Sequence, residues 1–147
     1  MQSADVSLLM SVYIKENPEY FRQSLKSALG QTVKAKEIVL ILDGPITTEL
    51  QEVIIDFKKD NLEVLKVVPL DNNVGLGKAL AIGVEVCKYD LVARMDTYDI
   101  MLPSRIEKQY SEFTKDPNLT IVGSNIDEFY DSPKSIVGRR IVPETNR

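Results

Sequence analysis

Apolar runs along this chain alternate with segments whose apolar positions recur at helical spacing. Val6 to Tyr13 is a short apolar run rich in strand-forming residues. Asn17 and Pro18 then mark a helix start, and apolar positions recur from Phe21 to Leu29. Glu37 to Leu42 is almost wholly apolar, which is typical of a strand covered on both faces in a parallel sheet. The pattern therefore predicts strand, helix, strand.

The same alternation continues through most of the chain. Thr47 or Thr48 is expected to cap a second helix. Further strands are predicted at Leu62–Val68, Asp90–Met95 and Thr120–Ser124, with helices at Leu76–Lys88 and, after Pro103, at Ser104–Lys115. Such alternation predicts an α/β fold, with a mainly parallel twisted sheet flanked by helices on both faces, as in Rossmann-like proteins. No linker divides the chain, so residues 1–147 are expected to form a single domain.

Composition narrows the possible functions. The 147 residues are 44% apolar and carry a formal net charge of -4, which disfavours a nucleic-acid-binding surface. The chain has no histidine, so any general base must be Asp, Glu, Lys or Tyr. Cys87 is the single cysteine, which excludes an intrachain disulfide and fits a reducing compartment. Without an apolar run long enough to span a bilayer or a secretory signal, a cytoplasmic location is expected.

Polar side chains follow three of the predicted strands, where ligands bind in parallel sheets. Ser11, Val12 and Tyr13 end the first strand, and Asp43 ends the second. Tyr13 is suited to stack on a nucleobase, and Asp43 to accept a hydrogen bond from the base. The alternative is that Asp43 and Gly44 only form a turn, and that Tyr13 is an aromatic side chain at the sheet edge.

Two further groups are candidates for binding a diphosphate. Asp96 and Asp99, after the fourth strand, could hold Mg²⁺ or Mn²⁺, or could merely end the strand and cap the next helix. Lys78 opens a helix after Gly75 and could meet phosphate oxygens, or could be a solvated helix residue. Arg94 precedes Met95 in an apolar strand and is expected to pair with a nearby carboxylate.

Four segments, in their order and spacing, resemble the family 2 inverting glycosyltransferases that build bacterial polysaccharides. They are MSVYIKENPEYFRQSLKSALGQT, EIVLILDGP, DNNVGLGKAL and ARMDTYDIMLPSRIEKQ. The resemblance extends to about Val122 and implies the nucleotide-diphospho-sugar transferase (GT-A) fold. It also implies that Ser11, Val12, Tyr13 and Asp43 hold the base of a nucleotide, usually uridine, with Lys78 and Asp96 as further nucleotide-sugar-binding residues.

The last segment resembles the family's acidic metal motif, RMDADDxxxPxRxxKQ. Asp96 and Asp99 match it, but Tyr98 stands where relatives have the middle acid, a principal metal ligand. A neutral phenol with a pKa of about 10 is a poor ligand for a hard cation. Three outcomes for the Mn²⁺ or Mg²⁺ site remain open: weakened binding, lost binding, or a site moved to Asp96 or Asp99.

The resemblance implies transfer of a sugar from a nucleotide-diphosphate donor, a UDP-sugar, to a glycan or lipid-linked glycan acceptor with inversion. The family's base is an Asp or Glu expected beyond Arg147, so the chain is expected to keep the donor site but not turnover, and to lack the acceptor-binding part. Membrane association, at the inner face, would come only through missing segments. The alternative is a non-catalytic nucleotide-sugar-binding or interaction domain on a degenerate transferase scaffold.

Overall fold

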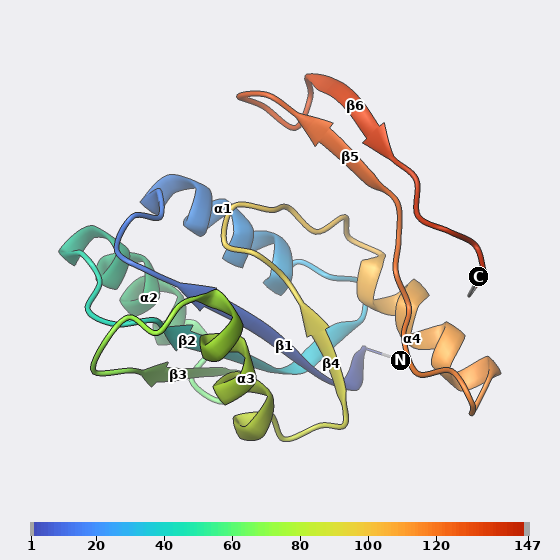
Figure 1. Ribbon diagram of the computed structural model, residues 1–147, viewed down its shortest axis with the longest axis horizontal. Coiled ribbons are helices and arrows are strands. Elements are labelled where there is room, and N and C mark those ends of the chain that lie inside the picture. The colour runs from blue at the N-terminus through green and yellow to red at the C-terminus, as the bar shows by residue number, and fades with distance from the viewer. Residues whose placement is uncertain (1, 146–147) are drawn as a thin grey trace. The chain divides into compact units, whose positions relative to one another are not determined.

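The computed structural model describes residues 2–145, which divide into two compact units at the Lys108–Gln109 bond. The first unit holds a four-stranded sheet of order β3-β2-β1-β4, in which every neighbouring pair is parallel (Figure 1). The elements of this unit are β1 (Ser3–Val12), α1 (Pro18–Leu29), β2 (Lys34–Leu42), α2 (Thr48–Asp60), β3 (Leu65–Pro69), α3 (Leu76–Val86) and β4 (Leu91–Arg94). Helix α4 (Arg105–Lys115) crosses the boundary between the units.

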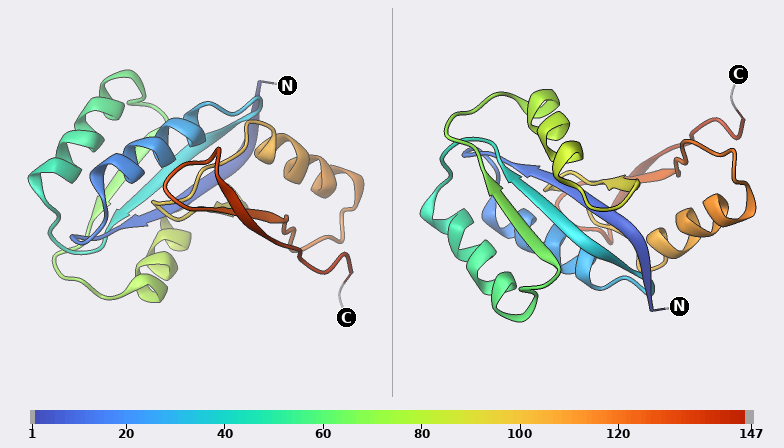
Figure 2. Two further views of the ribbon diagram at one scale, coloured as in Figure 1. Left: turned by 90° about the horizontal axis from the view of Figure 1, so that it is seen from above. Right: turned by 90° about the horizontal axis from the view of Figure 1, so that it is seen from below.

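Helices cover both faces of the sheet, which confirms the predicted fold class. Strands β1, β2 and β3 follow one another across the sheet, whereas β4 returns to the other side of β1. Because β-α-β crossovers are right-handed, this reversal places α3 on the face opposite α1 and α2. Figure 2 shows α1 and α2 together on one face and α3 on the other. The reversal also makes the β1–β4 boundary a topological switch point, where open α/β sheets bind ligands.

The two central strands form the core. Alternate side chains of a strand point to opposite faces, so Leu8 and Met10 lie on one face and Leu9 on the other. Leu9 packs with Val39 and Ile41 of β2 and with Ala79 of α3, and all four are almost fully buried. The near-continuous apolar runs of β1 and β2 therefore reflect burial on both faces.

Side-chain caps fix where the first two helices begin. The Asn17 Oδ1 atom accepts hydrogen bonds from the backbone N–H groups of Glu19 and Tyr20, at 2.9 and 3.1 Å. Thr47, rather than Thr48, caps α2, because its Oγ1 accepts from the Leu50 N–H at 3.2 Å. Each cap satisfies N–H groups that have no partner within the helix.

The second unit corrects one prediction. Residues 120–124 form no strand; the unit instead contains an antiparallel hairpin of β5 (Ile126–Phe129) and β6 (Ile136–Arg140). The predicted strand rested on few apolar residues, and Ile121 is 73% exposed. A strand needs a neighbouring strand for its hydrogen bonds, and the pairing with β6 begins at Ile126. Within this pairing Asp127 lies opposite Arg139 and forms an ion pair with it at 2.7 Å.

A buried serine ties the turn before β4 to the sheet. The Ser7 hydroxyl donates to Glu37 Oε2 at 2.5 Å and accepts from the Tyr89 N–H at 3.1 Å. The Lys88 N–H donates to the same Glu37 oxygen at 2.8 Å.

Among residues 2–145, no helix is long and apolar enough to cross a membrane.

Ser7→Ala is expected to lower the free energy of unfolding by about 1–3 kcal/mol, because buried polar groups lose their partner. Urea denaturation measures this loss. Lys59→Ala is the control: it removes an exposed ion pair with Asp56 and should change stability by less than about 0.5 kcal/mol. Equal effects of the two substitutions would show that the Ser7 contacts add nothing beyond a surface pair.

Candidate functional site

The carboxyl ends of three strands meet at one edge of the sheet. In β1 and β2 the register pairs Val12 with Leu42, so Tyr13 and Asp43 leave neighbouring strands together. On the other side of β1, Leu9 pairs with Arg94, and the Met95 N–H donates to the Leu9 carbonyl at 3.1 Å. The chain thus stays beside β1 as it approaches Asp96. These strand ends border the switch point between β1 and β4.

Asp43 is buried and joins the end of β2 to the loop before α3. Its Oδ1 accepts a hydrogen bond from the Val74 N–H at 2.7 Å, and its carbonyl accepts from Asn73 Nδ2 at 3.2 Å. Gly44 has φ 84°, and its backbone packs directly against Asn73. Among the described residues only Oδ1 of the Asp43 carboxylate is hydrogen-bonded, so Oδ2 is left for a donor group on a ligand. The turn at Asp43 is therefore also a link between two loops.

The other residues predicted near a base differ in what they can offer. Tyr13 is 39% exposed, so part of this residue can be reached by a ligand. Ser11 is half-buried, whereas Val12 is fully buried. The Val12 side chain belongs to the core, and its carbonyl already accepts the Asp43 N–H at 2.8 Å. Val12 therefore supports Tyr13 and Asp43 from within the sheet.

Lys78 is exposed in the first turn of α3, close in sequence to the loop that Asp43 binds. The helix begins after Gly75, which has φ 89° and supplies no side-chain cap. The first backbone N–H groups of a helix have no partner within it and favour negative charge. The start of α3 and the Lys78 ammonium can therefore attract an anion.

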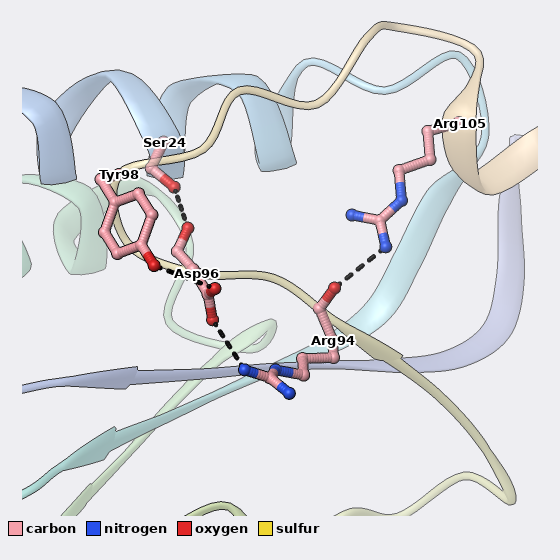
Figure 3. Close-up of polar contacts among 5 residues, drawn as sticks. All are labelled: Ser24, Arg94, Asp96, Tyr98 and Arg105. Carbon is pink, nitrogen blue, oxygen red and sulfur yellow. Dashed lines mark hydrogen bonds and ion pairs between the residues drawn. The ribbon is translucent and has the colours of Figure 1, made fainter. Parts of the chain in front are cut away.

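The segment after β4 forms a polar turn around Asp96. Its Oδ1 pairs with Arg94 Nη2 at 3.4 Å, and its Oδ2 accepts from the Tyr98 hydroxyl at 3.3 Å (Figure 3). The Ser24 hydroxyl of α1 donates to the Asp96 carbonyl at 3.1 Å. The ion pair predicted for Arg94 is confirmed, although the side chain is 57% exposed because β4 is an edge strand.

Polar side chains of α1 and of the loop that follows it hold the rest of this segment. The Ser27 hydroxyl accepts from the Met101 N–H at 3.0 Å. Gln31, just beyond the end of α1, donates from Nε2 to the Leu102 carbonyl at 2.9 Å and accepts at Oε1 from the Ile106 N–H at 3.1 Å. Arg105 Nη2 in turn donates to the Arg94 carbonyl at 2.9 Å. These contacts fix the position of the turn against the sheet.

Carboxylates gather at this edge and shift one another's pKa values. The Asp96 charge is the main reason that the pKa of Tyr98 is raised, so its hydroxyl stays a donor. Burial and then Asp96 raise the pKa of Asp99, opposed by Arg105 and Arg94. Burial also raises the pKa of Glu16, with the nearby Thr97 side chain opposing the shift and Asp96 adding to it. The Thr97 hydroxyl is buried and has no partner at full hydrogen-bond geometry among the described residues.

Glu16 and Thr97 were not predicted from the sequence. Glu16 lies in the loop directly after Tyr13, and its N–H donates to the Tyr13 carbonyl at 3.1 Å. Its electrostatic coupling to Asp96 shows that the loop after β1 lies close to the turn after β4. An acid just beyond the first strand was the available signal, since Asp43, Asp96 and Asp99 were chosen for such positions after other strands.

Comparison with known proteins identifies the family of this chain. The sequence profile of the family described as Glycosyl transferase family 2 matches residues 7–146. The chain belongs to glycosyl transferase family 2. The resemblance that the four segments carried is thereby confirmed.

Among relatives within the family, an uncharacterized glycosyltransferase of Haemophilus influenzae is 46% identical over 93% of this chain and 51% of its own length. The amylovoran biosynthesis glycosyltransferase AmsE of Erwinia amylovora is 45% identical over 90% of this chain and 49% of its own. UDP-Gal:alpha-D-GlcNAc-diphosphoundecaprenol beta-1,3-galactosyltransferase of Escherichia coli is 36% identical over 95% of this chain and 50% of its own. The chain spans about half the length of these relatives.

Solved structures support the fold. The mannosyltransferase PcManGT of Pyrobaculum calidifontis, in complex with GDP-Man and Mn²⁺, matches with a TM-score of 0.65 and 12% identity over 88% of this chain and 36% of its own. S. aureus TarS matches with a TM-score of 0.61 and 19% identity over 75% of this chain and 19% of its own. At this identity the likeness concerns the fold, and it agrees with the GT-A architecture expected for the family.

Proposed function

We propose that this chain is the donor-binding part of a glycosyltransferase that moves a sugar from a UDP-sugar to a glycan or lipid-linked glycan with inversion. The observation that carries the proposal is the register that brings Tyr13 and Asp43 out of adjacent strands beside a switch point. The Escherichia coli relative supports the donor and acceptor classes, because its name includes UDP-Gal and a diphosphoundecaprenol-linked sugar. We assign donor binding to residues 1–147 as one domain.

The uridine would be held by the strand ends. Tyr13, which is partly exposed, would stack on the base, and the Asp43 Oδ2 can accept the imide N–H of uracil. Ser11 would border the base site from β1, and Val12 would support it from the core. Lys78 and the N–H groups at the start of α3 would meet the diphosphate, where negative charge is most stabilised. Asp96 would lie on the sugar-phosphate side of the nucleotide.

The proposed reaction is a single in-line displacement. A carboxylate base removes the proton from an acceptor hydroxyl, the oxygen attacks the anomeric carbon, and the bond to the departing UDP breaks. Electrostatic contacts to the diphosphate stabilise the leaving group. Attack from the face opposite UDP inverts the configuration. We place the base and the acceptor site outside residues 1–147, at the cytoplasmic face of the membrane, and expect this chain alone to bind donor without transferring sugar.

Calorimetric titration with UDP, in EDTA and separately in Mn²⁺, tests the donor class. UDP is expected to bind, and ADP to bind at least about tenfold more weakly because the larger purine does not fit a site shaped for uracil. ADP is the matched control, since it carries the same diphosphate. Absence of UDP binding in both conditions, or equal affinity for ADP, would count against the proposal.

A further inference from the structure

The contacts of Asp96 do not suit a divalent cation. A cation held by this carboxylate would need one of its oxygens, yet Arg94 pairs with Oδ1 and the Tyr98 hydroxyl donates to Oδ2. Both partners present hydrogen or positive charge to the carboxylate, as a metal ion would. Mn²⁺ or Mg²⁺ bound through either Asp96 oxygen would therefore compete with the ion pair to Arg94 or with the hydrogen bond from Tyr98.

The side chain at position 98 adds no ligand of its own. Hard divalent cations prefer anionic oxygen, and a protonated phenol is a poor substitute for a carboxylate. Tyr98 is 56% exposed and directs its hydroxyl at Asp96, as Figure 3 shows. Across residues 2–145, no group of three or more acidic, histidine or cysteine side chains is arranged to hold a metal.

The charges around the turn also disfavour a divalent cation. Asp96 and Asp99 bring two negative charges, and both Arg94 and Arg105 act electrostatically on Asp99. Arg94 also pairs with Asp96 directly. A carboxylate at position 98 would add a negative charge and a ligand together, whereas Tyr98 adds neither. The attraction of clustered carboxylates for a divalent cation is thus reduced by the two arginine charges and again by the neutral side chain at position 98.

We propose that the donor site of this chain binds its nucleotide diphosphate without a divalent cation, because Arg94 and Tyr98 occupy the Asp96 carboxylate where a cation would bind. The inference rests on the proposed function for its ligand, the nucleotide diphosphate. The manganese-bound relative PcManGT shares the fold at low identity, so its metal says nothing about these side chains. Tyr98 is the residue at which this chain departs from the acidic metal motif of the family.

Mn²⁺ binding by the chain alone is measured first, by electron paramagnetic resonance of free Mn²⁺, which requires no nucleotide. Wild type is expected to leave the free-ion signal unchanged, whereas Tyr98→Asp should reduce it. Tyr89→Asp is the matched control, because it adds the same charge just before β4, at the end of this strand opposite to Asp96. A decrease in the free Mn²⁺ signal with wild type would overturn the inference. A decrease with Tyr89→Asp as large as that with Tyr98→Asp would overturn the role of position 98.

UDP affinity in EDTA and in Mn²⁺ is the second readout. The UDP affinity of wild type should agree within about twofold in the two conditions, while Tyr98→Asp should bind UDP about tenfold more tightly with Mn²⁺. A wild-type affinity that rises tenfold with Mn²⁺ would overturn the inference. If UDP binds in neither condition, the proposed donor class fails, and the Mn²⁺ titration without nucleotide still decides whether a cation site exists.

Discussion

Asp43→Ala is expected to weaken UDP binding by about 100-fold, because it removes a hydrogen bond to a charged acceptor and releases the loop at Val74. Calorimetry measures the affinity, and circular dichroism checks that the fold is retained. The substitution combines two effects, since Asp43 both faces the proposed base site and holds the loop before α3. A second variant is needed to separate them.

Asp43→Asn distinguishes a direct contact with uracil from support of the loop before α3. The amide keeps an Oδ1 acceptor for the Val74 N–H but presents an NH₂ group where the carboxylate has Oδ2. An NH₂ group cannot accept the imide N–H of uracil, so UDP affinity should fall by about tenfold or more while stability changes little. Wild-type affinity in Asp43→Asn would show that Asp43 acts only by holding the loop.

Gly44→Ala is expected to lower the free energy of unfolding by about 3 kcal/mol or more and to abolish measurable UDP binding. Two costs add at this residue. Its φ of 84° strains any L side chain, and an added Cβ would lie 2.6 Å from the backbone nitrogen of Asn73. Backbone cannot move aside as a side chain tip can, so the loop would separate from Asp43.

Gly75→Ala is the matched control for this prediction. Gly75 has a similar φ of 89°, but an added Cβ would meet nothing within 4 Å. Only conformational strain remains, which we expect to cost about 1–2 kcal/mol. Urea denaturation compares the two variants. If Gly44→Ala is no more destabilising than Gly75→Ala, the contact between Gly44 and Asn73 is not tight in solution.

Most of the first unit could be predicted because local signals and long-range packing agree there. Asn17 and Thr47 cap helices through bonds to residues only two or three positions away, so their role is visible in sequence. The uninterrupted apolar run of β2 follows from burial on both faces. The β5–β6 hairpin was not predicted, because its residues are exposed and leave no apolar alternation to recognise.

By itself, the sequence determined the α/β class, the family and the candidate strand ends, because apolar periodicity and motif order are written along the chain. Tertiary structure decided which of those polar groups meet. Asp43 reaches Val74, Ser24 reaches the Asp96 carbonyl, and Glu16 comes close to Asp96, all across long separations in sequence. Such pairs depend on strand order and register, which no local pattern encodes. The physical reason is that side-chain chemistry is local, whereas proximity is set by how the whole sheet is assembled.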